Sequence, residues 1–238
     1  AYIGQGDCAL ALQHWESAAM AYRGAVRKSR GDRELLFAAY RGLGNAHRSM
    51  GNIDKSILGF RKAIAEQSDD SIALAGLGEA LLSRDENPSV ETIAEAERHL
   101  TYALETGPDG NVVHLGLGKI ALVQGDPEKA HEHFAKIKEA ANPQHEVVAF
   151  IGQGDAALLQ GNANDAHQFY LQALDKAPNN AALHARLGTV HARINSGNSA
   201  LRSFQRSLAI EENIDVLKKA LDTALAHGFI TMAVDFAD

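Results

Sequence analysis

The sequence predicts an all-α protein built from repeated helix-turn-helix units. It has 238 residues, 45% of them hydrophobic and 22% charged, which is enough apolar material for a folded chain. Only five prolines interrupt it, and scarce prolines favour helices. One glycine recurs at spacings of 38, 34, 40, 36 and 34 residues, at Gly6, Gly44, Gly78, Gly118, Gly154 and Gly188. Self-similarity at a period of this length is typical of a solenoid.

A second feature follows each repeated glycine: a small residue, then a large one four positions later. The pairs are Ala18/Tyr22, Ser56/Phe60, Ala96/Leu100, Ala130/Phe134, Ala166/Tyr170 and Ala200/Phe204. Residues four apart share one face of a helix. Each unit is therefore expected to have a helix A that carries the glycine and a helix B that carries the pair. Neither helix can bury its apolar stripe alone, so stacked units should share one core.

We expect six units and a damaged seventh in a single array. Their approximate bounds are 1–34, 37–70, 71–110, 111–146, 147–180 and 181–214, followed by a degenerate or truncated segment, 215–238. Turn residues between helices A and B occur at 50–54 and 124–128, where Pro127 suits the first turn of a helix. Both chain ends fall inside helical patterns, which favours a fragment of a longer protein.

The pattern of the best units resembles the tetratricopeptide repeat family, and the resemblance covers nearly the whole chain. One unit has Tyr40, Leu43, Gly44, His47, Ser56, Phe60 and Ala63; another has His114, Leu117, Gly118, Ala121, Ala130, Phe134 and Ile137. The resemblance implies a right-handed superhelical solenoid that holds another protein and has no catalytic activity of its own.

Composition excludes several classes of partner and site. The formal net charge is −7, so the chain lacks the positive field expected of a nucleic-acid or anionic-membrane binder. A single cysteine, Cys8, allows no intrachain disulfide and no cysteine-based metal site. No stretch approaches the roughly 20 apolar residues of a membrane-spanning helix.

The helical period also predicts where a partner would bind. With the repeated glycine numbered 8, positions 2, 5, 6, 9, 12 and 13 of helix A should line the concave surface. Position 6 is Gly4, Gly42, Gly76, Gly116, Gly152 and then Arg186. A glycine inside a helix costs about 1 kcal/mol relative to alanine, so the row needs an explanation. We interpret it as a shallow track for a partner's helix or extended segment; the alternative is that neighbouring helices need the space themselves.

Polar residues beside this row are the predicted partner contacts. Position 9 gives Asp7, Asn45, Glu79, Lys119, Asp155 and Thr189, and nearby positions add Arg41, Arg48 and Arg193. The simpler reading is that these side chains are merely solvated.

Charge is unevenly distributed along the chain. Residues 22–62 contain ten lysines and arginines against three acids, whereas residues 69–110 contain ten acids against two arginines. The acidic stretch includes a longer loop, 83–92, between helices A and B. A dipolar partner or self-association could exploit this asymmetry, and ordinary surface variation is the other explanation.

Chemical motifs are weak. The sequences Gly4-x-Gly-x-x-Ala9 and Gly152-x-Gly-x-x-Ala157 match a dinucleotide fingerprint on paper, but they lie within helices and recur with the repeat. His131 and His133 are two residues apart on a helix and point away from each other, so they cannot chelate one ion. The histidines at repeat packing positions are expected in the core: His47, His114, His184 and His191. We expect no enzyme activity, no cofactor and no metal.

The kind of partner is indicated only by resemblance. One subclass of the family clamps the C-terminal carboxylate of chaperones with lysine, asparagine and arginine at set positions. This chain offers Arg41 and Asn45, then Gly76, then Val112 and Gly116, which leaves that clamp incomplete. The alanine-rich Leu-Gly units are similar to bacterial assembly proteins of pili, secretion and exopolysaccharide export, which implies an envelope or periplasmic location. The alternative is a cytosolic adaptor or regulatory domain attached to an enzyme or a chaperone system.

Overall fold

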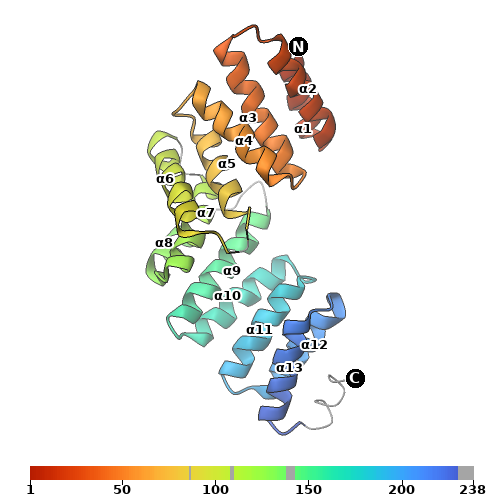
Figure 1. The fold of residues 1–238 in the computed structure, drawn as a ribbon. Coiled ribbons are helices and arrows are strands. Elements are labelled where there is room, and N and C mark those ends of the chain that lie inside the picture. Colours follow the sequence, from red (N-terminus) through yellow and green to blue (C-terminus); the bar gives the residue numbers. More distant parts are fainter. Residues whose placement is uncertain (86, 108–109, 138–142, 230–238) are drawn as a thin grey trace. The chain divides into compact units, whose positions relative to one another are not determined.

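The computed structural model describes residues 1–85, 87–107, 110–137 and 143–229 (Figure 1). All regular secondary structure in these ranges is helical, and thirteen helices are present in them. The chain forms two compact units, residues 1–120 and 121–238. The all-α prediction is confirmed, with the helices arranged as repeated pairs.

The first compact unit consists of consecutive helix pairs, each packed against the next in chain order (Figure 1). Its helices are α1 (Tyr2–Ala11), α2 (Trp15–Lys28), α3 (Arg33–Ser49), α4 (Ile53–Glu66), α5 (Ser71–Leu82) and α6 (Val90–Thr106), followed by α7 (Asn111–Gln124), which runs past its end. Odd-numbered helices up to α11 carry the repeated glycine and are helices A; even-numbered ones are helices B.

The second compact unit continues the same alternation. Its helices are α8 (Pro127–Ala135), α9 (Pro143–Leu159), α10 (Ala163–Lys176), α11 (Ala181–Arg193), α12 (Gly197–Ile210) and α13 (Ile214–Ala226). Helix α13 packs against α12 and occupies the start of the expected seventh unit, while residues 230–238 of that unit lie outside the described part.

Local chemistry sets the helix boundaries. Side chains at helix starts accept hydrogen bonds from backbone N–H groups that have no partner inside the helix, as Asp70 does from Ala73 and Asn180 from Leu183. The turn between helices A and B repeatedly places one residue in the left-handed region, seven positions after the repeated glycine. These residues are Gln13, Gly51, Gly125, Gly161 and Asn195. The predicted turns at 50–54 and 124–128 are thus confirmed.

The core is built around the large residue of each helix B. The side chains of Tyr22, Phe60, Leu100, Phe134, Tyr170 and Phe204 are at most 2% exposed. Each lies against helix A of its own unit or of the next. A Cβ placed on Gly44 would lie 2.7 Å from the Phe60 ring, and one placed on Gly76 would lie 2.5 Å from it. The ring of Phe60 is therefore held between two glycines of successive units, which is how the repeat closes its core.

Candidate protein-binding site

The glycines at position 6 of helix A are packing residues at four of five positions. Gly42 lies against Tyr22, Gly76 against Phe60, Gly116 against Leu100 and Gly152 against Phe134, so that a Cβ on any of them would overlap the neighbouring side chain. All four are buried, and only Gly4 is exposed with no atom near its Cβ direction. The expectation of an open glycine track is corrected at these four positions, because large side chains of the preceding units occupy the space.

Several of the predicted polar contact residues in the first compact unit bind one another or the core. Asp7 accepts a hydrogen bond from the Tyr22 hydroxyl at 2.7 Å. Burial and this carboxylate raise the pKa of Tyr22. Arg41 pairs with Asp70 at 3.1 Å, and Arg48 pairs with Glu79. Among the predicted residues, Asn45 is half-buried and Lys119 is exposed.

The second compact unit repeats part of this arrangement. Asp155 accepts a hydrogen bond from the Tyr170 hydroxyl at 2.5 Å, and Arg186 pairs with the same carboxylate at 3.1 Å. Burial and the charge of Asp155 raise the pKa of Tyr170. Asp155 and Arg186, both predicted as partner contacts, therefore bind each other and connect α11 to α9, while the Tyr170 hydroxyl connects α10 to α9.

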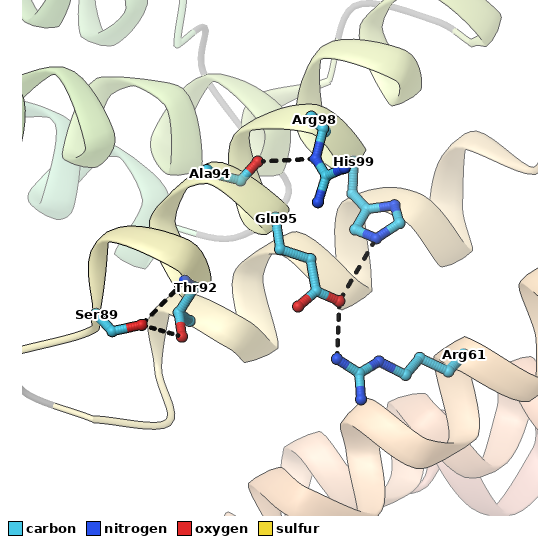
Figure 2. Close-up of polar contacts among 7 residues, drawn as sticks. All are labelled: Arg61, Ser89, Thr92, Ala94, Glu95, Arg98 and His99. Atoms are coloured by element: carbon cyan, nitrogen blue, oxygen red, sulfur yellow. Dashed lines mark hydrogen bonds and ion pairs between the residues drawn. The ribbon is translucent and has the colours of Figure 1, made fainter.

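The charge asymmetry of the first compact unit is partly neutralised by ion pairs between neighbouring repeats. Arg61 of α4 donates to Glu95 of α6 at 2.7 Å, and Arg84 pairs with Asp54 at 3.3 Å. Figure 2 shows the Glu95 carboxylate between Arg61 and His99, whose Nε2 lies 3.9 Å from it. Burial nevertheless lowers the pKa of His99, so the ring is uncharged at neutral pH.

The structure has an open, apolar hollow on the helix A face of the second compact unit. It has a volume of about 300 Å³ and lies between α7, α9 and α11. We call it the helix A groove and define it by its lining residues, which are Leu122, Val123, Asp155, Leu158, Leu159 and Arg193. Val123 and Leu159 are 64% and 55% exposed, which is unusual for large apolar side chains that lie next to each other.

Position in the repeat explains the helix A groove. Its lining residues occupy positions 9, 12 and 13 of helix A, which are three of the positions predicted to line the binding surface. Asp155 and Arg193 were among the predicted contacts, but the four apolar residues were not. Val123 and Leu159 could have been found from the sequence, because they are large apolar side chains at position 13, on the face predicted to be open.

Charge in the helix A groove is provided by one side chain. Asp155 is bonded to Tyr170 and Arg186, whereas Arg193 is exposed and makes no ion pair with any carboxylate of the described residues. An apolar floor with one available guanidinium suits a peptide or helix that presents apolar side chains and an acidic or carbonyl group.

The histidines of the described residues lie at packing positions or on the surface. His114 and His184 are buried and His47 and His191 half-buried, as their packing positions predicted. His131 lies edge-on to the Phe169 ring, with 5.8 Å between ring centroids. In the described ranges, no three His, Cys, Asp or Glu residues are grouped closely enough to hold a metal ion. Nor is any described helix both long and apolar enough to span a bilayer.

Comparison with known proteins gives the family. A model of the tetratricopeptide repeat matches residues 92–146 and 151–213. No curated protein matches the sequence.

Solved structures with the same fold are distant in sequence. PilF of Pseudomonas aeruginosa is 16% identical, with a TM-score of 0.70 over 86% of this chain and 90% of its own. PilW, described as a type IV pilus biogenesis factor, is 18% identical, with a TM-score of 0.70 over 94% and 96%. YrrB, described as having an unusual peptide-binding site, is 18% identical, with a TM-score of 0.59 over 84% and 96%. The repeated glycine and aromatic positions, the helix pairs and the family match together identify this chain as a tetratricopeptide repeat protein.

Proposed function

We propose that the chain is a non-catalytic scaffold that binds a peptide or helix of another protein in the helix A groove. The observation that carries this proposal is the pair of exposed apolar side chains, Val123 and Leu159, in an open hollow of about 300 Å³. Exposed apolar area of this kind is costly in water and is removed from water when a partner's apolar side chains cover it.

The proposal extends to the assembly of a bacterial envelope complex such as a pilus. It is supported by the likeness to PilF and PilW over almost the full length of each chain. Sequence identities of 16% and 18% indicate a shared fold, and the assembly role is tested by the experiment below.

Site-specific photo-crosslinking tests both parts. A photoreactive amino acid replaces Leu159 in the full protein in its own cells, and the same substitution at Leu171 of α10 is the control, since that leucine is 41% exposed and outside the groove. We expect a discrete crosslinked partner from position 159 and none from position 171. Leu159→Glu should weaken capture of that partner about tenfold or more, as expected for the centre of an interface.

The identity of the crosslinked partner also distinguishes an envelope assembly role from a cytosolic adaptor role. A crosslinked partner in the envelope fraction supports the assembly proposal, and a cytosolic enzyme or chaperone as partner supports the adaptor alternative. Equal crosslinking at both positions, or none at position 159, would contradict the groove as the binding site.

A further inference from the structure

A second hollow lies in the first compact unit, on a different face of helix A. It has a volume of about 270 Å³ and is formed by α2, α3 and α4. Leu43 and Tyr40 of α3 and Leu58 of α4 give it an apolar lining, and Leu58 is 54% exposed. We call this hollow the basic pocket. Tyr40 and Leu43 occupy positions 4 and 7 of helix A, which elsewhere are used for packing, so the basic pocket is separate from the helix A groove.

Gly59, which also lines the basic pocket, sets how closely α4 packs on α3. It stands fifteen residues after the repeated glycine, where other units with the same loop length have Ala21, His133, Phe169 and Ser203. A Cβ on Gly59 would lie 2.7 Å from the backbone nitrogen of Gly44, so α4 approaches α3 more closely than a side chain would permit. The pocket lies beside this close contact, where Leu58 and Lys62 of α4 line it together with Tyr40, Leu43 and His47 of α3.

His47, which lines the pocket, differs from its counterpart in the sixth repeat. Both His47 and His191 stand three residues after the repeated glycine. Nδ1 of His191 is hydrogen-bonded to Ser203 at 3.1 Å, whereas Nδ1 of His47 is buried without a hydrogen-bond partner among the described residues. Gly59 occupies the place of Ser203 and supplies no hydroxyl. A buried polar atom without a partner costs about 1–3 kcal/mol, which a bound ligand group could recover.

Three cations surround the apolar lining: Arg23 of α2 and Lys55 and Lys62 of α4. All three are exposed, and none makes an ion pair with a carboxylate of the described residues. Neighbouring Arg41, Arg48 and Arg61 differ in this respect, because each pairs with an acid that belongs to α5 or α6 or caps α5. The rim of this pocket therefore carries positive charge of the basic stretch, residues 22–62, that the described acids do not neutralise.

We propose that the basic pocket binds an acidic segment of a partner protein that inserts one aromatic side chain beside Leu58 and His47. The volume suits a single large side chain, and carboxylates on either side of it would pair with Lys55, Lys62 and Arg23. The inference rests on the proposed role as a scaffold. It adds a second contact site, whose positive charge is complementary to an acidic partner segment.

The test uses the full chain and three synthetic heptapeptides with blocked ends. The probe has one phenylalanine between glutamates; the second has alanine in place of phenylalanine, and the third has lysines in place of glutamates. Binding is measured by fluorescence anisotropy at low salt, and the site by amide chemical shifts. We expect the probe to bind and to shift Leu43, His47 and Leu58, and both other peptides to bind at least about tenfold more weakly.

Variants locate the effect. Leu58→Asp and Lys55→Glu should each weaken the probe about tenfold, whereas the matched controls Leu171→Asp and Lys219→Glu should not. All four side chains are exposed, so the variants should fold, which circular dichroism checks. Equal binding of the alanine peptide, no binding of the probe, or loss only in the control variants would overturn the inference. Crosslinking at Leu159 tests a separate site in the second compact unit, so a failure of the peptide experiment leaves the proposed function standing.

Discussion

Two interfaces between neighbouring repeats both contain a buried tyrosine, but the following helix A contacts that tyrosine in different ways. Tyr22 lies between the first and second repeats and donates to Asp7 of its own repeat at 2.7 Å. Tyr170 lies between the fifth and sixth and donates to Asp155 of its own repeat at 2.5 Å. Position 6 of the following helix A is Gly42 in the first case and Arg186 in the second. The backbone of α3 thus lies directly on the Tyr22 ring, whereas α11 carries a side chain there.

This difference shows what the glycine does. A Cβ on Gly42 would overlap the Tyr22 ring, so the close approach of α3 requires glycine there. Arg186 does have a Cβ, and its guanidinium returns to Asp155, the acceptor of the Tyr170 hydroxyl. One interface is therefore closed by backbone contact and the other by an ion pair. The helix penalty of about 1 kcal/mol for Gly42 is offset by the packing that it permits.

The largest effect should come from filling the glycine contacts. Gly42→Ala and Gly76→Ala should each lower the free energy of unfolding by up to about 2 kcal/mol, because overpacking at contacts of 2.4 and 2.5 Å costs up to about 3 kcal/mol and the gain in helix propensity returns about 1. Urea denaturation measures the change.

Gly4→Ala is the matched control, since nothing lies within 4 Å of its Cβ direction. It should be neutral or stabilising. If Gly42→Ala and Gly76→Ala were equally harmless while binding of a partner weakened, these glycines would be contact residues and the packing explanation would be wrong.

The next effect is on alkaline stability. The folded-state pKa of Tyr22 and Tyr170 is raised by burial and by Asp7 and Asp155, so both hydroxyls stay protonated where those of the unfolded chain ionise. Their contribution is complete below about pH 10, the ordinary tyrosine pKa, and is lost as the pH rises above it, by up to about 1.4 kcal/mol per pH unit for each tyrosine.

Denaturation curves at successive pH values above neutrality measure this loss. The double variant Tyr22→Phe/Tyr170→Phe should show a distinctly shallower decline. An unchanged decline in that variant would mean that other groups, such as lysines, govern alkaline unfolding.

The repeat itself could be predicted from the sequence because its signals are local. The glycine, the small residue and the large residue recur at fixed spacing, and helical periodicity places them on packing faces, where the structure has Gly44, Ser56 and Phe60. The binding surface was harder to predict, because its composition depends on contacts between repeats. Gly76 appears solvent-facing on a single helix, yet Phe60 of the preceding unit covers it.

The same reason explains the polar residues. A helical wheel places Arg48 and Glu79 on the exposed face of separate helices, but they lie about one repeat apart and pair with each other. The groove residues Val123 and Leu159 are the converse case: their residue types are typical of a core, yet they remain exposed because no described helix of the compact unit covers them.

A smaller effect is expected from the two hydroxyl groups themselves. Tyr22→Phe and Tyr170→Phe should each cost about 1 kcal/mol, below the usual 1.5–3 kcal/mol for a hydrogen bond to a charged group, because both carboxylates keep access to water. Urea denaturation at neutral pH measures the change. The two values should agree within error, since the aromatic ring stays in place in both. A loss confined to Tyr170→Phe would show that the ion pair with Arg186 strengthens that hydrogen bond.

The smallest effect should follow removal of the ion pair. Arg186 and Asp155 have side chains that are 39% and 31% exposed, and pairs of this kind contribute roughly 0.2–1 kcal/mol. Arg186→Ala should therefore lower the free energy of unfolding by well under the cost of Gly42→Ala, and the difference from the unchanged protein should shrink at high salt because exposed charges are screened. Denaturation at low and high salt measures both. A cost that exceeds that of Gly42→Ala, or one that salt leaves unchanged, would mean that the Arg186 side chain stabilises this interface by packing. The two interfaces would then differ only in the size of the residue that packs against the tyrosine.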